Sequence, residues 1–207
     1  MKNIFAALCA TVILAFSANV QAAPMLYADA GTANAQTYVF TAAAAGNISA
    51  YFAGSFAGYT NEISLLVNGV ETGIVGLKNF TSDYGDQLDF GMVMPGDILV
   101  FKLITTTPVG VGPWYSEQSR NSDGVNHVYS AAFAGDANIP AGTYVAFEDL
   151  IGGGDFNYID ENFVFVNVVS RISGPDAASV PEPASLALLG LGIAGLAVSR
   201  RRRGKSA

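Results

Sequence analysis

Short runs in which apolar and polar residues alternate recur between residues 36 and 169, and Gly, Asn, Asp and Pro separate them. The apolar positions are rich in Val, Ile, Phe and Tyr, which favour a pleated, half-buried strand. Many short strands at this spacing are typical of a β-sandwich or barrel rather than of βαβ units. The pattern predicts strands over residues 36–40, 47–56, 62–67, 70–74, 87–93, 98–104, 127–133, 143–149 and 163–169.

Turn signals lie between these runs. Asn68-Gly69 supplies the two positive φ angles of a tight hairpin, and residues 94–97 and 139–142 each join a proline to a glycine in a turn. No long segment of helical period interrupts residues 36–169. We therefore expect an all-β fold, an antiparallel and jelly-roll-like β-sandwich, with a signal helix before it and a single hydrophobic helix after it.

The N-terminal segment has the pattern of a secretory signal peptide. Lys2 supplies a positive charge, residues 4–16 are almost continuously apolar or small, and Val20-Gln21-Ala22 offers a cleavage site after Ala22. The apolar run is too short to span a membrane. We therefore expect export through the secretion machinery and removal of residues 1–22 by signal peptidase.

The C-terminal segment combines three features. Pro181-Glu182-Pro183 interrupts regular structure, residues 184–199 are apolar or small, and a cluster of arginines follows at Arg200, Arg201, Arg202 and Arg203. Sixteen residues are fewer than the roughly 20 that cross a hydrocarbon core, but snorkelling arginines and local thinning make up the difference. We expect the arginines to stay in the cytoplasm, so that the body faces outward. An ordinary tail anchor is the alternative that these physical features leave open.

These boundaries divide the chain into a signal peptide (1–22), a β-sandwich body (23–173), a linker with Pro-Glu-Pro (174–183) and a sorting tail (184–207). The only cysteine, Cys9, lies in the signal peptide, so the exported chain has no disulfide and no cysteine-bound zinc. Residues 23–179 carry 16 Asp and Glu against four Lys and Arg, a net charge of −12. Such a body repels nucleic acid and suits polysaccharide, divalent cations or simple solubility.

The most acidic part of the body is a glycine-rich loop between two predicted strands. Three glycines at 152–154 let backbone carbonyls turn inward, and calcium takes six to eight oxygen ligands. The spacing is not that of an EF-hand. We expect a calcium site whose ligands are Glu148, Asp149, Asp155, Asn157 and Asp160; the alternative is an exposed acidic hairpin without an ion.

Other residues offer weaker chemistry. His127 with Ser116 and Asp123 provides the residue types of a catalytic triad, but no Gly-x-Ser-x-Gly motif is present, and a triad depends on geometry. We expect His127 to start a strand and to bond the turn at 121–123. Five aromatic residues are candidates for a sugar-stacking platform or for ordinary packing, namely Tyr51, Tyr59, Trp114, Tyr115 and Tyr158.

The C-terminal segment "VPEPASLALLGLGIAGLAVSRRRR" resembles the PEP-CTERM sorting signal of Gram-negative bacteria that make extracellular polysaccharide. The resemblance implies recognition by a membrane-embedded exosortase, an inner-membrane intermediate with the body in the periplasm, and release to the cell surface or extracellular matrix. The same kind of tail is associated with ice-binding proteins. The sorting signal determines where the protein is sent and implies no activity.

Part of the body resembles a domain of unknown function that is common in exported bacterial proteins. The similar segments are Trp114-Tyr115-Ser116, residues 121–128 (NSDGVNHV) and residues 147–155 (FEDLIGGGD). Asn157 and Ile159 depart from that family's acidic loop pattern. The resemblance implies a β domain suspected of binding calcium and implies no reaction.

The sequence thus predicts a non-enzymatic structural or adhesive protein of the cell surface, matrix or biofilm, in contact with exopolysaccharide and stabilised by Ca²⁺. A module that binds polysaccharide or ice is the first alternative, and a secreted hydrolase is the second. No nucleic-acid partner is expected.

Overall fold

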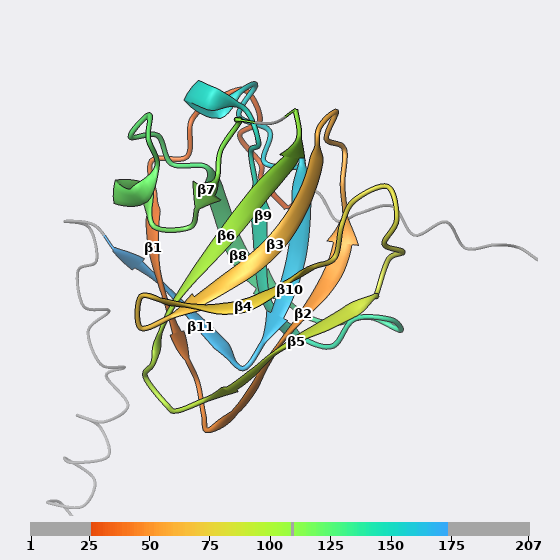
Figure 1. The fold of residues 1–207 in the computed structure, drawn as a ribbon, viewed down its shortest axis with the longest axis vertical. Coiled ribbons are helices and arrows are strands. Elements are labelled where there is room, and N and C mark those ends of the chain that lie inside the picture. Colours follow the sequence, from red (N-terminus) through yellow and green to blue (C-terminus); the bar gives the residue numbers. More distant parts are fainter. Residues whose placement is uncertain (1–25, 109, 174–207) are drawn as a thin grey trace, which may run out of the picture.

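The computed structural model describes residues 26–108 and 110–173, which form two antiparallel β-sheets packed face to face (Figure 1). One sheet, called sheet A here, has the strand order β11-β1-β6-β3-β4, and β7 pairs with β6. The other, sheet B, has the order β5-β2-β10-β9-β8. The predicted all-β antiparallel sandwich is confirmed. The predicted signal helix and C-terminal helix lie outside the described residues.

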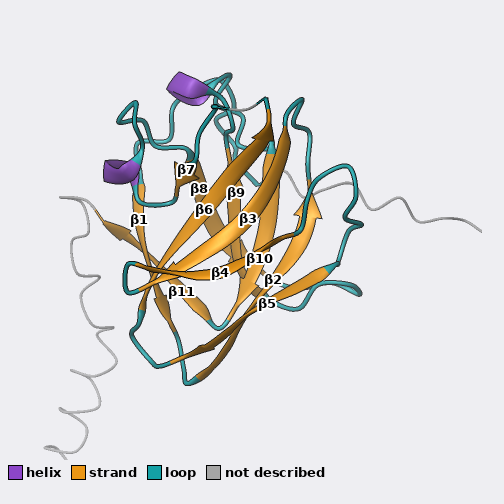
Figure 2. Cartoon of the chain, viewed as in Figure 1, coloured by secondary structure: helices purple, strands orange, loops and turns teal. Residues whose placement is uncertain are grey.

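The strands of sheet A are β1 (Thr37–Ala42), β3 (Thr60–Val67), β4 (Val70–Gly76), β6 (Ile98–Thr107), β7 (Trp114–Tyr115) and β11 (Val168–Ser173). Those of sheet B are β2 (Gly46–Gly54), β5 (Gln87–Val93), β8 (Val128–Phe133), β9 (Gly142–Phe147) and β10 (Glu161–Val166). Two short 3₁₀ helices, η1 (Gln118–Arg120) and η2 (Ile151–Gly153), are the only helical turns in the described part of the chain (Figure 2). Within that part, no helix is long and apolar enough to cross a membrane.

The predicted strand at 163–169 is wrong in one respect, because it is two strands. Asn167 has a φ of 67°, and there the chain leaves β10 in sheet B and enters β11 in sheet A. Its side chain closes the corner: Asn167 Oδ1 accepts from the Ala44 N–H at 2.8 Å, and Asn167 Nδ2 donates to the Ala44 carbonyl at 3.0 Å. β11 is an edge strand that pairs only with β1, from Thr37–Ser173 to Ala42–Val168.

Two predicted turns are confirmed. Asn68 and Gly69 have φ angles of 51° and 82° and join β3 to β4, with Val67 opposite Val70. The Asp97 N–H donates to the Met94 carbonyl at 3.1 Å in the turn before β6. The two-residue strand β7 was not predicted, because two residues carry no periodic signal.

The main core lies between the sheets. Phe101 of β6 stacks on Phe165 of β10 with ring centroids 3.8 Å apart, so the two sheets meet through aromatic rings. Each fully buried ring of this kind contributes about 2–3 kcal/mol of hydrophobic stabilisation. Alternate residues of β10, Phe163 and Phe165, point into this core, which fixes the inward face of the strand.

A second, smaller apolar cluster covers the outer face of sheet B. It contains Tyr144, Tyr158 and Val164, with Tyr27 and Tyr129 packed against it. The Tyr27 ring lies 4.8 Å from that of Tyr158, edge to face. Both faces of β9 and β10 are therefore covered, which buries the end of the hairpin that these two strands form.

Candidate functional site

The β9–β10 hairpin ends in four carboxyl groups. Glu148 and Asp149 directly follow β9, Asp160 precedes β10, and Glu161 is its first residue, paired with Phe147. Glu148 and Glu161 are 0% exposed and Asp149 is 3% exposed. Charged side chains are almost never buried so completely without a partner, because removing them from water is costly. We call these four residues the carboxyl cluster.

Neighbouring members of the cluster turn to opposite sides of sheet B. Glu148 Oε1 accepts a hydrogen bond from the Tyr158 N–H, on the side of the acidic loop. Asp149 Oδ2 accepts from Nδ2 of Asn61, a residue of β3 in sheet A, at 2.7 Å. Asp160 lies between them, and its Oδ2 accepts from the Asp149 N–H at 3.0 Å. The cluster thus has an outer side at Glu148 and an inner side at Asp149.

Burial dominates the electrostatics of the cluster. It raises the pKa of Glu161 to about 9, with the nearby charges of Asp149 and Asp160 adding to the effect. It raises the pKa of Glu148 to about 8 and that of Asp160 to about 6. Among the described residues, no Lys, Arg or His side chain forms an ion pair with any of the four. The cluster therefore resists holding four negative charges at neutral pH.

Several buried oxygens of this region accept no hydrogen bond within the described structure. They are both carboxyl oxygens of Glu161, Oε2 of Glu148 and Oδ1 of Asn162. An unsatisfied buried polar atom costs about 1–3 kcal/mol. Such a concentration at one hairpin indicates a place where a proton or a cation is held.

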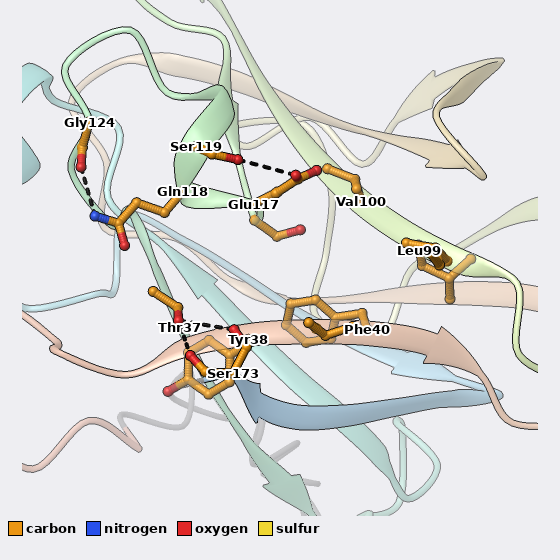
Figure 3. A pocket seen from close by; sticks show the side chains of 13 residues that line it. Thr37, Tyr38, Phe40, Leu99, Val100, Glu117, Gln118, Ser119, Gly124 and Ser173 are labelled. Carbon is orange, nitrogen blue, oxygen red and sulfur yellow. Dashed lines mark hydrogen bonds between the residues drawn. The ribbon is translucent and has the colours of Figure 1, made fainter. Parts of the chain in front are cut away.

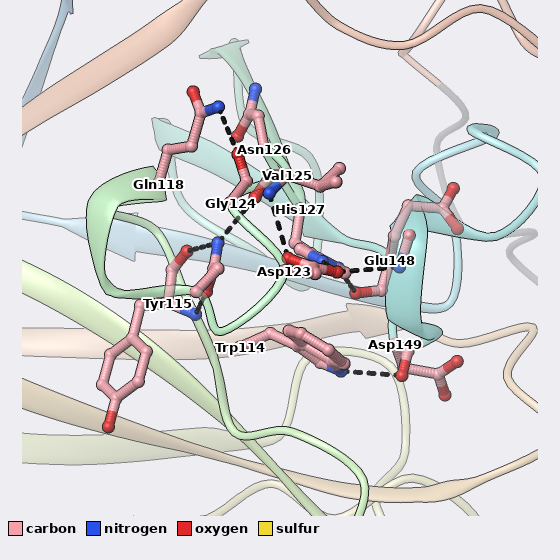
Figure 4. Close-up of polar contacts among 12 residues, drawn as sticks. Trp114, Tyr115, Gln118, Asp123, Gly124, Val125, Asn126, His127, Glu148 and Asp149 are labelled. Atoms are coloured by element: carbon pink, nitrogen blue, oxygen red, sulfur yellow. Dashed lines mark hydrogen bonds and ion pairs between the residues drawn. The ribbon is translucent and has the colours of Figure 1, made fainter.

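A ring pair and two hydrogen bonds hold this end of the hairpin in place (Figure 4). Trp114 stacks on His127 with centroids 3.9 Å apart, and its Nε1 donates to the Asp149 carbonyl at 2.7 Å. His127 Nδ1 lies 2.9 Å from the Glu148 carbonyl, and Nε2 lies 3.0 Å from Asp123 Oδ2. Both partners are acceptors, so a ring nitrogen that carries a proton donates to the partner it faces.

The predicted bond between His127 and the 121–123 turn is confirmed. Burial raises the pKa of Asp123, but the N–H groups of Gly152 and Val125 and the His127 ring outweigh it, so the net pKa is lowered. Ser116 Oγ accepts from the Phe101 N–H at 2.9 Å, and neither ring nitrogen of His127 bonds it. The three residues therefore hold backbone in place and do not form a triad.

The acidic loop bends through left-handed conformations. Phe156 and Tyr158 have φ angles of 53° and 52°, besides the three glycines. A Cβ at Gly154 would lie 2.9 Å from Glu148 Oε2, so glycine is needed there for space as well as for its φ of +56°. At the tip, Asn157 Nδ2 donates to Asp155 Oδ2 at 2.8 Å.

The five expected calcium ligands therefore fall into two groups. Glu148, Asp149 and Asp160 lie at the hairpin end, with Glu148 on the outer side and Asp149 on the inner side, whereas Asp155 and Asn157 bond each other at the loop tip. Asp155 still lies close enough for its charge to raise the pKa of Glu148. In the described residues, no three His, Cys, Asp or Glu side chains are already gathered as a metal-binding group. The five-ligand site stays a prediction, and it requires the loop tip to fold toward Glu148.

Sequence reasoning missed Glu161, Asn61 and Asn79, which complete the inner side of the cluster. The position of Glu161 was available in the sequence, because it shares the parity of Phe163 and Phe165 and so points inward. Asn61 and Asn79 gave no signal, since they reach the cluster from another sheet and another loop.

None of the five aromatic residues considered for a sugar-stacking platform is fully exposed. Trp114 and Tyr158 are each only 1% exposed, and Tyr51, Tyr59 and Tyr115 are half-buried. A separate groove of about 650 Å³ lies where β1 diverges from β6 (Figure 3). Tyr38 and Leu99 form its apolar wall, and Thr37, Gln118 and Ser119 supply polar groups.

Comparison with known proteins identifies one segment. Residues 179–203 match the PEP-CTERM protein-sorting motif, which contains Pro181, Glu182, Pro183 and the arginines 200–203. No curated protein and no solved structure matches the chain. The resemblance of the body to a domain of unknown function stays a prediction. The predicted cleavage site at Ala22 and the sorting motif itself lie outside the described residues. The chain carries a PEP-CTERM sorting motif, which implies an exported exosortase substrate with a membrane-anchored sorting intermediate and a surface destination.

Proposed function

We propose that this protein is a non-enzymatic structural or adhesive component of the cell surface or extracellular matrix, whose body is stabilised by Ca²⁺ at the β9–β10 hairpin. The sorting motif supports the surface destination. The observation that supports the role is the carboxyl cluster, three of whose four members are buried and none of which has a basic partner among the described residues. A small cation would compensate the charge of such a cluster.

The electrostatic argument is one of magnitude. Two carboxylates about 6 Å apart repel by about 3 kcal/mol at an effective dielectric near 20. The metal-free hairpin avoids this repulsion by keeping protons, as the raised pKa values of Glu148 and Glu161 indicate. A bound divalent cation converts the repulsion into ligation, and carboxylate and carbonyl oxygens are the ligands that calcium prefers.

The residues that would hold the ion are Glu148 and Asp160 at the hairpin end, with Asp155 and Asn157 from the loop tip. Asp149, the fifth expected ligand, faces the inner side of sheet B, where it bonds Asn61. The loop glycines give the tip the freedom to close on the ion. Such an ion would join the start of β10 to the end of β9 and would order the loop between them. It would supply stiffness and no chemistry.

The test is thermal melting of the full chain in mild detergent, with CaCl₂ or with EDTA. The fluorescence of Trp114, the only tryptophan, monitors unfolding. A site filled at about 100 times its dissociation constant adds about 2.7 kcal/mol of stability. We expect a higher melting temperature in calcium. Equal melting curves, with no calcium retained after dialysis, would remove calcium from the proposal.

Polysaccharide binding is a second candidate, which the groove beside β1 favours. Its wall combines the Tyr38 ring with the hydroxyl and amide groups of Thr37, Gln118 and Ser119, the pairing of apolar and polar surface that carbohydrates require. We expect retardation in a native gel that contains the exopolysaccharide and normal mobility for Gln118→Ala. Equal mobility of the natural chain with and without polysaccharide excludes this candidate.

A further inference from the structure

Glu161 is the least satisfied polar side chain of the described structure. It is 0% exposed, and neither of its carboxyl oxygens has a hydrogen-bond partner. It points between the sheets, on the face of β10 that carries Phe163 and Phe165 into the core. It was not among the expected calcium ligands, and it lies on the opposite side of sheet B from Glu148.

The donors around Glu161 are already committed to other acceptors. Asn61 Nδ2 donates to Asp149 at 2.7 Å, and the Asn61 N–H donates to Asn79 Oδ1 at 2.9 Å. Asn79 Nδ2 donates to the Tyr59 carbonyl at 2.8 Å, and Ser55 Oγ donates to the Asp160 carbonyl at 2.6 Å. The inner side therefore offers more oxygens than donors. The Ser55 hydroxyl and the Asn79 N–H act on Glu161 and lower its pKa, but they do not outweigh its burial.

Two carboxyl groups meet there. The charge of Asp149 acts on Glu161, and both residues lie on the inner side with Ser55 and Asn79 beside them. Two carboxylates match the charge of one divalent cation, and neutral hydroxyl and amide oxygens complete a shell for a hard ion. Such a site needs only two acidic ligands. It is therefore compatible with the finding that no three His, Cys, Asp or Glu side chains are gathered in the described residues.

We propose that Glu161 and Asp149 bind a hard divalent cation between the two sheets, at a site separate from the acidic loop. This inference deepens the proposed calcium stabilisation and rests on it. The ion would link β10 of sheet B, through Asp149 and its partner Asn61, to β3 of sheet A. It would act as an inter-sheet staple in an exported body that has no cysteine for a disulfide.

The test uses Glu161→Gln in the full chain in mild detergent at pH 8, with Ca²⁺ as the probe. Glutamine keeps the shape and resembles the protonated acid, but it lacks the charge that binds the ion. We expect the variant to melt higher than the natural chain in EDTA and to lose most of the calcium-induced shift. Equilibrium dialysis should show one bound calcium fewer per chain.

Two further variants separate the sites. Glu71→Gln, the same substitution at an exposed position on β4, should keep the calcium-induced shift of the natural chain. Asp155→Asn reports on the loop tip, and a shift that it keeps while Glu161→Gln loses it supports the inner site. A shift kept by Glu161→Gln and lost by Asp155→Asn overturns the inner site and leaves the proposed loop site standing. No calcium-induced shift in the natural chain overturns both.

A second substitution, Glu161→Asp, tests ligation by residue 161 even if Glu161→Gln does not fold. Glu161→Asp keeps the charge and draws the carboxylate back by one methylene. We expect the calcium concentration for half-maximal stabilisation to rise at least tenfold. An unchanged concentration would contradict ligation by residue 161.

Discussion

The carboxyl groups of Glu148 and Glu161 differ from ordinary surface acids because burial makes their charged forms costly. Facing groups add to this effect, namely Asp155 and Asp160 at Glu148, and Asp149 and Asp160 at Glu161. The folded state therefore holds protons that the unfolded chain releases near pH 4.

This difference sets the direction of a pH dependence. The contribution of both acids to stability is complete below their unfolded pKa and is lost as pH rises through the folded values of about 8 and about 9. In EDTA we expect the free energy of unfolding to fall between pH 6 and pH 9, on the order of 1 kcal/mol for each pH unit. Urea denaturation at several pH values measures it. Glu161→Gln should flatten the slope, and a stability that rises over this range would contradict the account.

Trp114 provides a second test at the scale of one side chain. Trp114→Phe removes the donor to the Asp149 carbonyl and changes the stack on His127. A buried carbonyl left without its donor costs about 1–3 kcal/mol. We therefore expect Trp114→Phe to melt at a lower temperature than the natural chain when melting is measured by circular dichroism. An unchanged melting temperature would mean that the indole N–H does not hold the hairpin end.

At the scale of elements, the corner at Asn167 is the place where pattern reading failed. The apolar run 163–169 continues through it, so periodicity alone predicts one strand. The break depends on a single residue with positive φ whose side chain bonds Ala44, which is distant in the sequence. Local pattern cannot report such a long-range contact.

A pair of substitutions tests this corner. Asn167→Gly keeps the left-handed backbone but loses both bonds to Ala44, whereas Asn167→Val loses the bonds and strains the backbone as well. We expect Asn167→Val to destabilise the fold by about 1–3 kcal/mol more than Asn167→Gly. Chemical denaturation of both variants checks the order, and equal stabilities would show that the φ angle does not matter.

The strands themselves could be predicted because β-branched and aromatic residues alternate with polar ones. The carboxyl cluster was predicted in part. Glu148, Asp149 and Asp160 were evident as a charge run next to glycines, but the partners Asn61 and Asn79 come from β3 and from the loop after β4. Their approach depends on how the sheets pack, which no local pattern encodes.

At the scale of the whole molecule, the sorting motif and the acidic body work in sequence. The motif sorts the exported body to the surface, where calcium, in the function proposed above, would complete the carboxyl cluster.

The sorting step has its own prediction. Replacing Arg200, Arg201, Arg202 and Arg203 with glutamine removes the positive charge that fixes orientation, and we expect less chain at the cell surface. Fractionation with a reporter fused just before Pro181 measures the distribution. A reporter active only in the cytosol of the natural chain would contradict export, and unchanged surface amounts in the variant would show that the arginines are dispensable.

The edge position of β11 has a mechanical consequence. This strand is the last described element before the sorting motif. In its sheet it pairs with one strand, β1, and Thr143 of β9 adds a bond to the Val168 carbonyl. While the tail is in the membrane, any drag on the body enters the fold through Ser173 and loads this strand before any other. Force spectroscopy from the C-terminus should therefore record the peeling of β11 as the first rupture, while the strands that carry the carboxyl cluster remain assembled.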